Sequence, residues 1–224
     1  VQKIDYIFHE AAYVSVSQSM LEPKTCYQVN VNGTENLIEE ARKAGVQRIV
    51  LASSAAVYGE PEAIPLSEDN KTQPLSPYAA SKKINEIYAE MYSRSFGMEI
   101  AVLRYFNVFG PRQAPDSQYA AAIPIFIRQL INGKPVTIYG DGAQTRDLIY
   151  VHDVVRANIM AAETPGAAGR IFNICTGVET SIQKLVDSLR VFFPEAGSIE
   201  YGEARDGDIY RSVGNPLRAF KELG

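Results

Sequence analysis

Two residues in segment 76–82, Tyr78 and Lys82, stand four positions apart and carry side chains that can take part in proton transfer. On a helix, positions i and i+4 share a face, so the Lys82 ammonium group can lie beside the Tyr78 hydroxyl. A free tyrosine has a pKa of about 10 and is a weak base at neutral pH. Because a nearby positive charge favours the phenolate, the pair has the chemistry of a general acid/base.

Two serines, Ser53 and Ser54, close an apolar segment, residues 48–52, upstream of this pair. A serine hydroxyl at a strand end can hydrogen-bond the same substrate oxygen from which Tyr78 would remove a proton. Capping of the strand end is the alternative role for both serines. Tyrosine and lysine at this spacing are common on solvated helices, so the added Ser-Ser pair makes the pattern more specific.

Apolar strands and long helices alternate in the first half of the sequence. The patterns predict strands at residues 4–9, 48–52 and 99–104, and helices at 29–44 and 77–96 that end before Gly45 and Gly97. This alternation predicts an α/β fold with a Rossmann-like, doubly wound parallel sheet. Ligands of such sheets bind at the carboxyl ends of the strands. The polar residues expected to converge there are His9, Ser53, Ser54 and Asn107.

After Pro111 the alternation weakens. The patterns there predict helices at 123–132, 152–163 and 182–193, strands at 136–139 and 171–175, and a loop at 112–122, with a further loop upstream at 60–75. We expect residues 1–110 to be the remainder of a nucleotide-binding domain. Residues 111–224 are expected to form mainly a smaller substrate-binding lobe, with some segments packing back on the first domain.

The composition of the 224 residues is that of a globular protein, with 46% hydrophobic and 21% charged residues. A net charge of −4 argues against a general nucleic-acid binder. Cys26 and Cys175 are too few for a disulfide framework and are expected to be buried thiols. His9 and His152, far apart in sequence, form no credible metal site. No signal peptide or membrane-spanning stretch is seen, so a cytoplasmic protein without membrane contact is expected.

Eight short motifs occur in order along the chain. They are His9-Glu10-Ala11-Ala12, Asn30-Val31-Asn32-Gly33-Thr34, Ser53-Ser54-Ala55-Ala56-Val57-Tyr58-Gly59, Pro77-Tyr78-Ala79-Ala80-Ser81-Lys82, Leu103-Arg104-Tyr105-Phe106-Asn107-Val108-Phe109-Gly110, Gly140-Asp141-Gly142, Arg146-Asp147-Leu148-Ile149-Tyr150-Val151 and Arg205-Asp206-Gly207-Asp208. With these motifs the chain resembles the extended short-chain dehydrogenases/reductases, specifically nucleotide-sugar 4-epimerases of the UDP-galactose / UDP-N-acetylglucosamine type.

The resemblance implies NAD as cofactor and transient oxidation as the reaction. Tyr78 would remove the proton from the sugar 4-hydroxyl while C4 gives a hydride to NAD, and the 4-keto sugar would then be reduced on its other face. Lys82 would hydrogen-bond the nicotinamide ribose and lower the pKa of Tyr78. Ser54, rather than Ser53, corresponds to the catalytic serine or threonine. Ala55 and Ala56 stand where related 4,6-dehydratases carry Asp and Glu, which favours epimerisation without elimination.

The resemblance also implies the binding residues. Those expected at the cofactor are Ala11, Ala12, Asn30, Ser53, Tyr78, Lys82, Tyr105 and Val108. Those expected at the UDP-sugar are Ser15, Ser54, Asn107, Ala121, Ala122, Tyr139, Arg146, Arg205, Asp208 and Ser212. Both arginines would face the diphosphate, Asp208 the ribose and Tyr139 the uracil. The residues alone leave alternatives open: tight packing for the two alanines, a helix N-cap for Asn30, and a solvent-facing side chain for Ser212.

Substrate range and assembly also follow from the resemblance. Ser212 stands at a wall position where a tyrosine would restrict the pocket, so turnover of both UDP-glucose/galactose and the N-acetylated UDP-sugars is expected. A homodimer is expected, paired through the helices at 29–44 and 77–96. A UDP-glucuronate 4-epimerase and a catalytically silent binding protein of the same fold remain alternatives.

Two features of the family are absent from this sequence: the Gly-rich turn for the NAD pyrophosphate and the acidic residue that grips the adenosine ribose. We therefore expect a fragment of a longer protein rather than a truncated relative, and poor NAD binding by these 224 residues alone.

Overall fold

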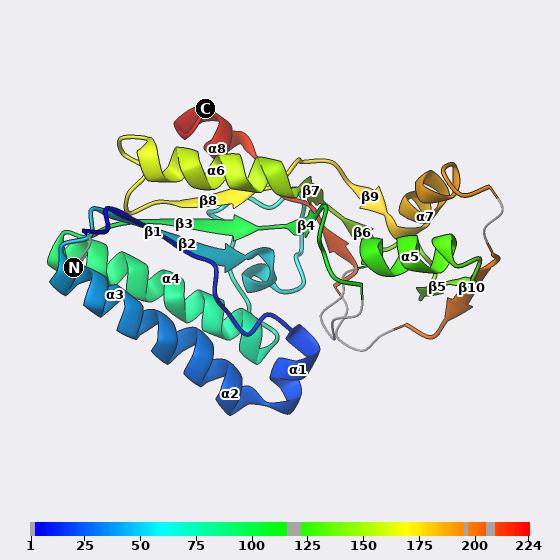
Figure 1. Cartoon of the computed structure of the whole chain (residues 1–224), viewed down its shortest axis with the longest axis horizontal. Helices are drawn as coiled ribbons and strands as arrows, with labels where there is room; N and C mark the ends of the chain where they lie inside the picture. Colours follow the sequence, from blue (N-terminus) through cyan, green and yellow to red (C-terminus); the bar gives the residue numbers. More distant parts are fainter. Residues whose placement is uncertain (1–2, 116–121, 195–196, 205–208) are drawn as a thin grey trace.

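The computed structural model describes residues 3–115, 122–194, 197–204 and 209–224. Its largest sheet has four parallel strands in the order β1 (Tyr6–His9), β2 (Arg48–Ser54), β3 (Glu99–Tyr105) and β8 (Ile171–Ile174). Figure 1 shows helices on both sides of this sheet, with α3 and α4 below it and α6 and α8 above it. The expected doubly wound parallel sheet is therefore confirmed.

Both faces of the central strands are apolar, which explains why the sheet is covered twice. On β2, Ile49 and Leu51 pack with α3 (Gly33–Ala44) and α4 (Pro77–Phe96). Val50 points to the other face, toward α6 (Val151–Glu163). Because side chains alternate along a strand, every second residue of β2 belongs to the same layer. α8 (Leu217–Glu222) adds apolar contacts to the α6 layer.

The two helices beside the sheet have well-defined ends. α4 begins after Ser76, whose hydroxyl accepts a hydrogen bond of 3.1 Å from the Ala79 N–H, and it ends at Gly97, where φ is 68°. The helix predicted at 29–44 is longer than expected. α2 (Pro23–Tyr27), a π-helical segment (η1, Gln28–Asn32) and α3 follow one another without a break, and Gly45 ends the run in the left-handed conformation.

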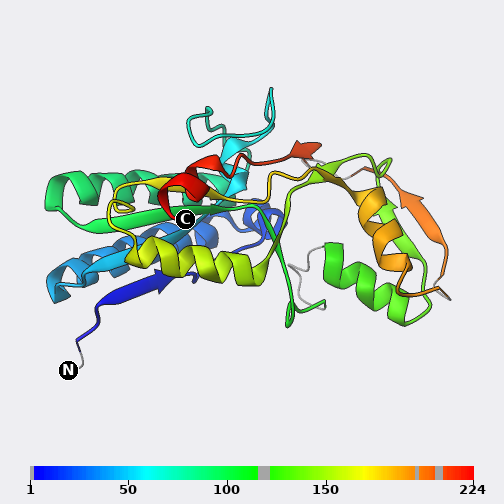
Figure 2. The same ribbon diagram turned by 90° about the horizontal axis from the view of Figure 1, so that it is seen from above.

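A smaller layer lies beyond the end of the sheet, as Figures 1 and 2 show. There α5 (Ala122–Ile131) and α7 (Ile182–Arg190) pack on the parallel pair β5 (Val136–Tyr139) and β10 (Ile199–Gly202). The core of this layer is made by Phe126, Leu130, Val136, Ile138, Ile182, Leu185 and Val186.

Short strands that the sequence did not predict connect the two layers. They are β4 (Asn107–Phe109) paired with β7 (Leu148–Tyr150), and β6 (Thr145–Arg146) between β9 (Thr180–Ser181) and β11 (Arg211–Ser212). Two other short elements, α1 (Val16–Leu21) and the 3-10 turn η2 (Ala55–Tyr58), follow β1 and β2.

A fully buried carboxylate, that of Asp147, ties these connections together. It accepts hydrogen bonds from the Thr176 N–H at 2.8 Å, the Thr176 hydroxyl at 2.7 Å, the Gly177 N–H at 2.9 Å and the Gly214 N–H at 3.2 Å. These four hydrogen bonds stabilise the buried carboxylate group. Asp147 thereby holds Arg146, on the preceding position, beside the end of the large sheet.

Candidate active site

The carboxyl ends of β1, β2 and β3 meet the first turns of α4, so the residues that follow these strands lie close together (Figure 1). Tyr78 and Lys82 occupy successive turns of α4, and the Lys82 ammonium nitrogen lies 6.0 Å from the centre of the Tyr78 ring. The expectation that these two side chains share one helix face is confirmed.

The Ser54 side chain lies close enough to the Tyr78 hydroxyl to act on its pKa as a hydrogen-bond donor. Ser54 also accepts a hydrogen bond of 3.2 Å from the Ala56 N–H, which leaves its own proton to be donated to Tyr78. Burial raises the pKa of Tyr78 above its ordinary value, and the hydrogen bond from Ser54 partly opposes that rise. The sequence predicted a lowered pKa for Tyr78; the structure gives a raised one, because desolvation of the phenolate outweighs the effect of Ser54.

Lys82 is 5% exposed, and its ammonium group donates a hydrogen bond of 2.9 Å to the carbonyl oxygen of Ala52. Burial lowers the pKa of Lys82 to about 8, against the opposing effect of the Glu10 carboxylate. The ammonium group is therefore directed at the end of β2 rather than at the Tyr78 hydroxyl. The Lys82 ammonium group still lies on the same helix face as Tyr78, so one bound ligand could contact both side chains.

Ser53, which was predicted at the cofactor, has a buried side chain on the α4 side of the sheet. Its hydroxyl donates a hydrogen bond of 2.7 Å to the Glu86 carboxylate on α4, and the residue is 3% exposed. The cause is strand alternation, since Ser53 shares a face with Leu51, in the core below the sheet. The side chain is thus occupied by a protein contact.

Asn30 is not the N-cap that the sequence left open, because it lies inside the π-helical segment. Its side chain accepts a hydrogen bond of 2.7 Å from the Tyr13 N–H and donates bonds of 3.1 Å to the Tyr13 carbonyl and 2.9 Å to the Ser81 hydroxyl. π-helical insertions are frequent at functional sites. Here Asn30 fixes the segment that follows β1 against the helix of Tyr78.

The segment after β1 contributes one acidic group that the sequence reasoning missed. Glu10 accepts a hydrogen bond of 2.7 Å from the Tyr105 hydroxyl, which also accepts one of 2.8 Å from Asn158 on α6. Burial raises the pKa of Tyr105 and that of Glu10. The motif that contains Glu10 was recognised, but nothing in its spacing pointed to Tyr105.

Ser15, which was predicted at the substrate, is buried. Its hydroxyl caps α1 by accepting a hydrogen bond of 3.0 Å from the Gln18 N–H.

These residues fit the nicotinamide and ribose end of NAD. Tyr78, Ser54 and Lys82 offer two hydroxyls and an ammonium group, which are the donors that a ribose and a reacting carbonyl require. Ala11 is exposed and Ala12 half-buried, and neither has a side chain beyond Cβ, so a ligand can approach the main chain there. The residue types and their placement thus suit the cofactor that the sequence predicted.

Several predicted substrate residues come from the short strands of the second layer. Arg146 on β6 and Ser212 on β11 are partners in parallel register. Ser212 is 8% exposed, so the alternative of a solvent-facing side chain is wrong. Asn107 is exposed at the start of β4, and Val108, predicted at the cofactor, follows it half-buried. Ala121, Arg205 and Asp208 lie outside the described residues.

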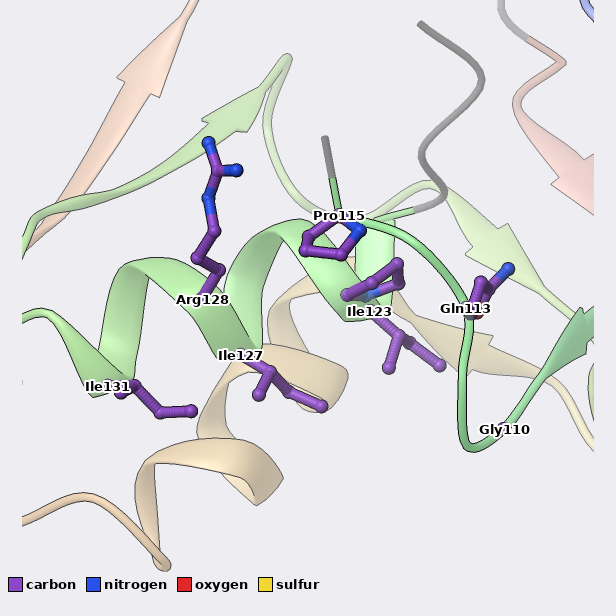
Figure 3. Close-up of a pocket in the computed structure, with 8 residues that line it drawn as sticks. Gly110, Gln113, Pro115, Ile123, Ile127, Arg128 and Ile131 are labelled. Atoms are coloured by element: carbon purple, nitrogen blue, oxygen red, sulfur yellow. The ribbon is translucent and has the colours of Figure 1, made fainter. Parts of the chain in front are cut away.

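Two pockets of about 280 Å³ each lie in this layer. One is lined by Tyr139, Gly140, Asp141, Gln144, Ala204, Ile209 and Tyr210, and therefore contains the tyrosine predicted to contact the uracil. The other runs along α5, and Figure 3 shows Ile123, Ile127 and Ile131 on that helix near the loop of Gly110 and Gln113. Ala122 is the first residue of the same helix.

Among the residues that the structure describes, no three His, Cys, Asp or Glu side chains are grouped so that they could hold a metal ion. None of the described helices is both long and apolar enough to cross a membrane.

Comparison with known proteins gives consistent results. Residues 1–175 match the model of the NAD dependent epimerase/dehydratase family. A putative UDP-glucose 4-epimerase of Methanocaldococcus jannaschii is 42% identical over 209 residues, which is 93% of this chain and 67% of that protein. The present chain therefore spans about two thirds of the length of that relative.

Two solved structures are also similar. A UDP-N-acetylglucosamine 4-epimerase from Methanobrevibacter ruminantium, in complex with UDP-N-acetylmuramic acid, superposes with a TM-score of 0.94 at 37% identity and covers 98% of this chain and 70% of its own. A UDP-glucose 4-epimerase from Thermotoga maritima, with UDP-glucose, gives a TM-score of 0.94 at 36% identity, with 98% and 71% coverage.

Proposed function

The chain belongs to the NAD dependent epimerase/dehydratase family, and we propose that it catalyses NAD-dependent 4-epimerisation of a UDP-hexose through a transient 4-keto intermediate. The single observation that carries the proposal is the placement of the Ser54 side chain beside the Tyr78 hydroxyl, with Lys82 one turn further along the same helix face. The names of the relatives, UDP-sugar 4-epimerases, support the same reaction.

In the proposed mechanism Tyr78 takes the proton of the sugar 4-hydroxyl and later returns it. Ser54 hydrogen-bonds the same oxygen and holds it at the reacting distance from Tyr78. Bound NAD supplies the hydride acceptor and a positively charged ring, which favours the phenolate of Tyr78. Lys82 holds the ribose and adds a further positive charge on the same side of α4.

The residues after β2 support epimerisation rather than elimination of water. Ala55 and Ala56 form the first half of η2, directly after Ser54. Neither side chain can donate or accept a proton, so a second acid/base pair for dehydration is missing from this turn. The 4-keto sugar would therefore be reduced again rather than dehydrated.

The proposed nucleotide site uses the second layer. Arg146 and Arg205 are proposed at the diphosphate, because a planar guanidinium matches phosphate oxygens. Asp208 is proposed at the ribose and Tyr139 at the uracil. Small side chains at Ala122 and Ser212 favour a pocket that accepts both plain and N-acetylated hexoses, which the names of the two similar structures also suggest.

A homodimer and a cytoplasmic location complete the proposal. Two apolar residues on α4, Ile87 and Met91, are 53% and 38% exposed. Neighbouring exposed apolar side chains are typical of a surface that contacts another protein. We propose that α3 and α4 pair with the same helices of a second copy. Cys26 and Cys175 are buried free thiols, which agrees with a reducing compartment.

The test is an assay of the complete protein, with its Gly-rich NAD-binding segment, in the presence of NAD and three candidate substrates in separate reactions: UDP-glucose, UDP-N-acetylglucosamine and UDP-glucuronate. Separation of the products by chromatography should show the 4-epimers of the first two. Conversion of UDP-glucuronate alone would favour the UDP-glucuronate 4-epimerase alternative. Binding of the UDP-sugars without any turnover would favour the silent binding protein.

A further inference from the structure

Three neighbouring residues at the end of β2 each contact a different turn of α4. The pairs are Ala52 with Lys82 at 2.9 Å, Ser53 with Glu86 at 2.7 Å, and Ser54 with Tyr78. Tyr78, Lys82 and Glu86 are spaced four residues apart, so they lie along one face of the helix. Two of the three contacts involve the proposed acid/base groups. The remaining one, between Ser53 and Glu86, involves neither and has no role in the proposed mechanism.

Glu86 is 2% exposed, and a carboxylate at that depth is costly unless it is fully paired. Arg104, which is also 2% exposed, donates two hydrogen bonds of 2.8 Å to the two carboxylate oxygens. Lys83 adds a contact of 3.0 Å. Burial alone would raise the pKa of Glu86, but the hydrogen bonds from Arg104 hold it below its ordinary value. The pair is therefore an ionised, two-pronged clamp.

This clamp is fixed to the sheet at several points. Arg104 on β3 is the register partner of Ser53 on β2, so Glu86 is held by two adjacent strands. On its other side Arg104 donates a hydrogen bond of 2.8 Å to the Tyr58 hydroxyl. That hydroxyl in turn donates a hydrogen bond of 2.7 Å to the side-chain oxygen of Asn173 on β8. The third turn of α4 is thus tied to three strands of the sheet by polar contacts, in addition to its apolar packing on β2.

We propose that Glu86, clamped by Arg104 and linked to β2 by Ser53, is a positioning residue that sets the register of α4 against the end of β2. This proposal rests on the proposed function, in which Tyr78 and Lys82 must meet the sugar and the cofactor. Proton transfer needs heavy atoms within hydrogen-bond reach, and a misplacement of about 1 Å can cost about 10²-fold in rate. In this role the side chains of Glu86, Arg104 and Ser53 act through Tyr78 and Lys82 and do not need to contact a ligand.

The test compares two serine variants of the complete protein, which includes the Gly-rich NAD-binding segment. Ser53→Ala removes the hydroxyl that joins Glu86 to β2 and leaves the ion pair in place. Ser93→Ala is the matched control, because the Ser93 hydroxyl is a buried group on the same helix without a hydrogen-bond partner among the described residues. We expect Ser53→Ala to lower kcat about tenfold with KM for the UDP-sugar changed less than about twofold. The control should leave both unchanged.

A second measurement does not depend on turnover. The titration of Lys82 can be followed by NMR of its carbon-13-labelled side chain in nucleotide-free protein. If α4 loosens from β2, water reaches Lys82 and its pKa rises by about one unit toward the ordinary lysine value. Ser53→Ala should show this rise and Ser93→Ala should not. A wild-type protein without epimerase activity would sink the proposed function, while this titration would still decide the positioning role.

Arg104→Lys serves as a second variant, because it keeps the positive charge and loses the two-pronged contact. It should reproduce the loss of kcat and the rise in the pKa of Lys82. Thermal unfolding of each variant shows whether it is folded. If Ser53→Ala and Arg104→Lys are folded and match the control in both kcat and the Lys82 titration, the positioning role is overturned.

Discussion

The ammonium group of Lys82 donates a hydrogen bond of 2.9 Å to the carbonyl oxygen of Ala52, the residue that stands two positions before Ser54 on β2. The lysine of the proposed acid/base pair is therefore anchored to the strand that carries the proposed serine. This contact is one of those that join α4 to the end of β2, where the chemistry is proposed to take place. It also buries the lysine, and the burial has a measurable effect on stability.

Lys82→Met should stabilise the nucleotide-free protein at neutral pH by about 2 kcal/mol, since it removes a buried charge and loses one hydrogen bond. The folded pKa of Lys82 is about 8, below the ordinary value of 10.5. Between these values the unfolded chain binds a proton that the folded chain has lost, so the stability of the wild type rises with pH. The advantage of the variant should therefore shrink as pH increases through this window.

Thermal unfolding at neutral pH and at pH about 10 checks this expectation. Lys71→Met, at an exposed loop position, is the control and should show no such pH-dependent difference. A variant that is less stable than wild type at neutral pH would contradict the argument. The same variant should have lost turnover, since the ribose contact is gone.

Tyr78→Phe should abolish epimerisation and leave the fold intact. It removes one hydroxyl whose proposed task is proton transfer, and the loss of a general acid/base costs about 10²–10⁴-fold in rate. Turnover, UDP-sugar binding and thermal unfolding are the measurements, with Tyr27→Phe at an exposed tyrosine as control. If the Tyr78 variant turned over within about threefold of wild type, Tyr78 would not be the general acid/base.

Asp147→Asn should destabilise the protein by about 3 kcal/mol although it preserves shape, because an amide nitrogen would face backbone N–H donors. The carboxylate accepts from Gly177 and Gly214 through the same oxygen, so one rotation of the amide cannot satisfy every donor. Urea unfolding measures the effect. Asp153→Asn, at an exposed position on α6, should cost less than about 1 kcal/mol. If both substitutions lowered the free energy of unfolding equally, the hydrogen bonds of Asp147 would not be what joins the two layers.

Ile87→Glu should convert the proposed homodimer into a monomer, because a charge would be buried in the paired helices. Light scattering at micromolar concentration provides the mass. Val191→Glu is the control, as Val191 is 77% exposed at the end of α7, away from α4. A wild type that is already monomeric would refute the dimer, and an Ile87 variant that stays dimeric would place the interface elsewhere.

The long elements were predictable because their signals are local. The bounds of α4 follow from Ser76 and Pro77 at its start and Gly97 at its end, and the structure has the helix at the predicted residues. The buried strands were recognised by continuous apolar runs. By contrast, β6, β9 and β11 have two residues each, which is too short for any periodicity. Their positions depend on contacts with distant segments.

Sequence patterns could name candidate residues for the site, but they could not give the contacts of those residues. Alternation along β2 could have assigned Ser53 to the face of Leu51, and this signal was overlooked. Glu86, four residues beyond Lys82, was visible on the same helix face, but its partner Arg104 comes from another strand. The raised pKa of Tyr78 depends on how deeply the phenol is buried, which no sequence pattern gives.

Substrate range can be tested at Ser212, which is 8% exposed and lies beside Arg146 in parallel register. The small side chain leaves room near the proposed diphosphate site for a 2-acetamido group. Ser212→Tyr should fill that room, so turnover of UDP-N-acetylglucosamine should fall at least about tenfold while UDP-glucose is still converted. Ser212→Ala, the control, should keep both activities. If wild type rejects the N-acetylated substrate, or if the tyrosine variant still accepts it, the size of residue 212 does not set the range, even where the epimerase activity itself is present.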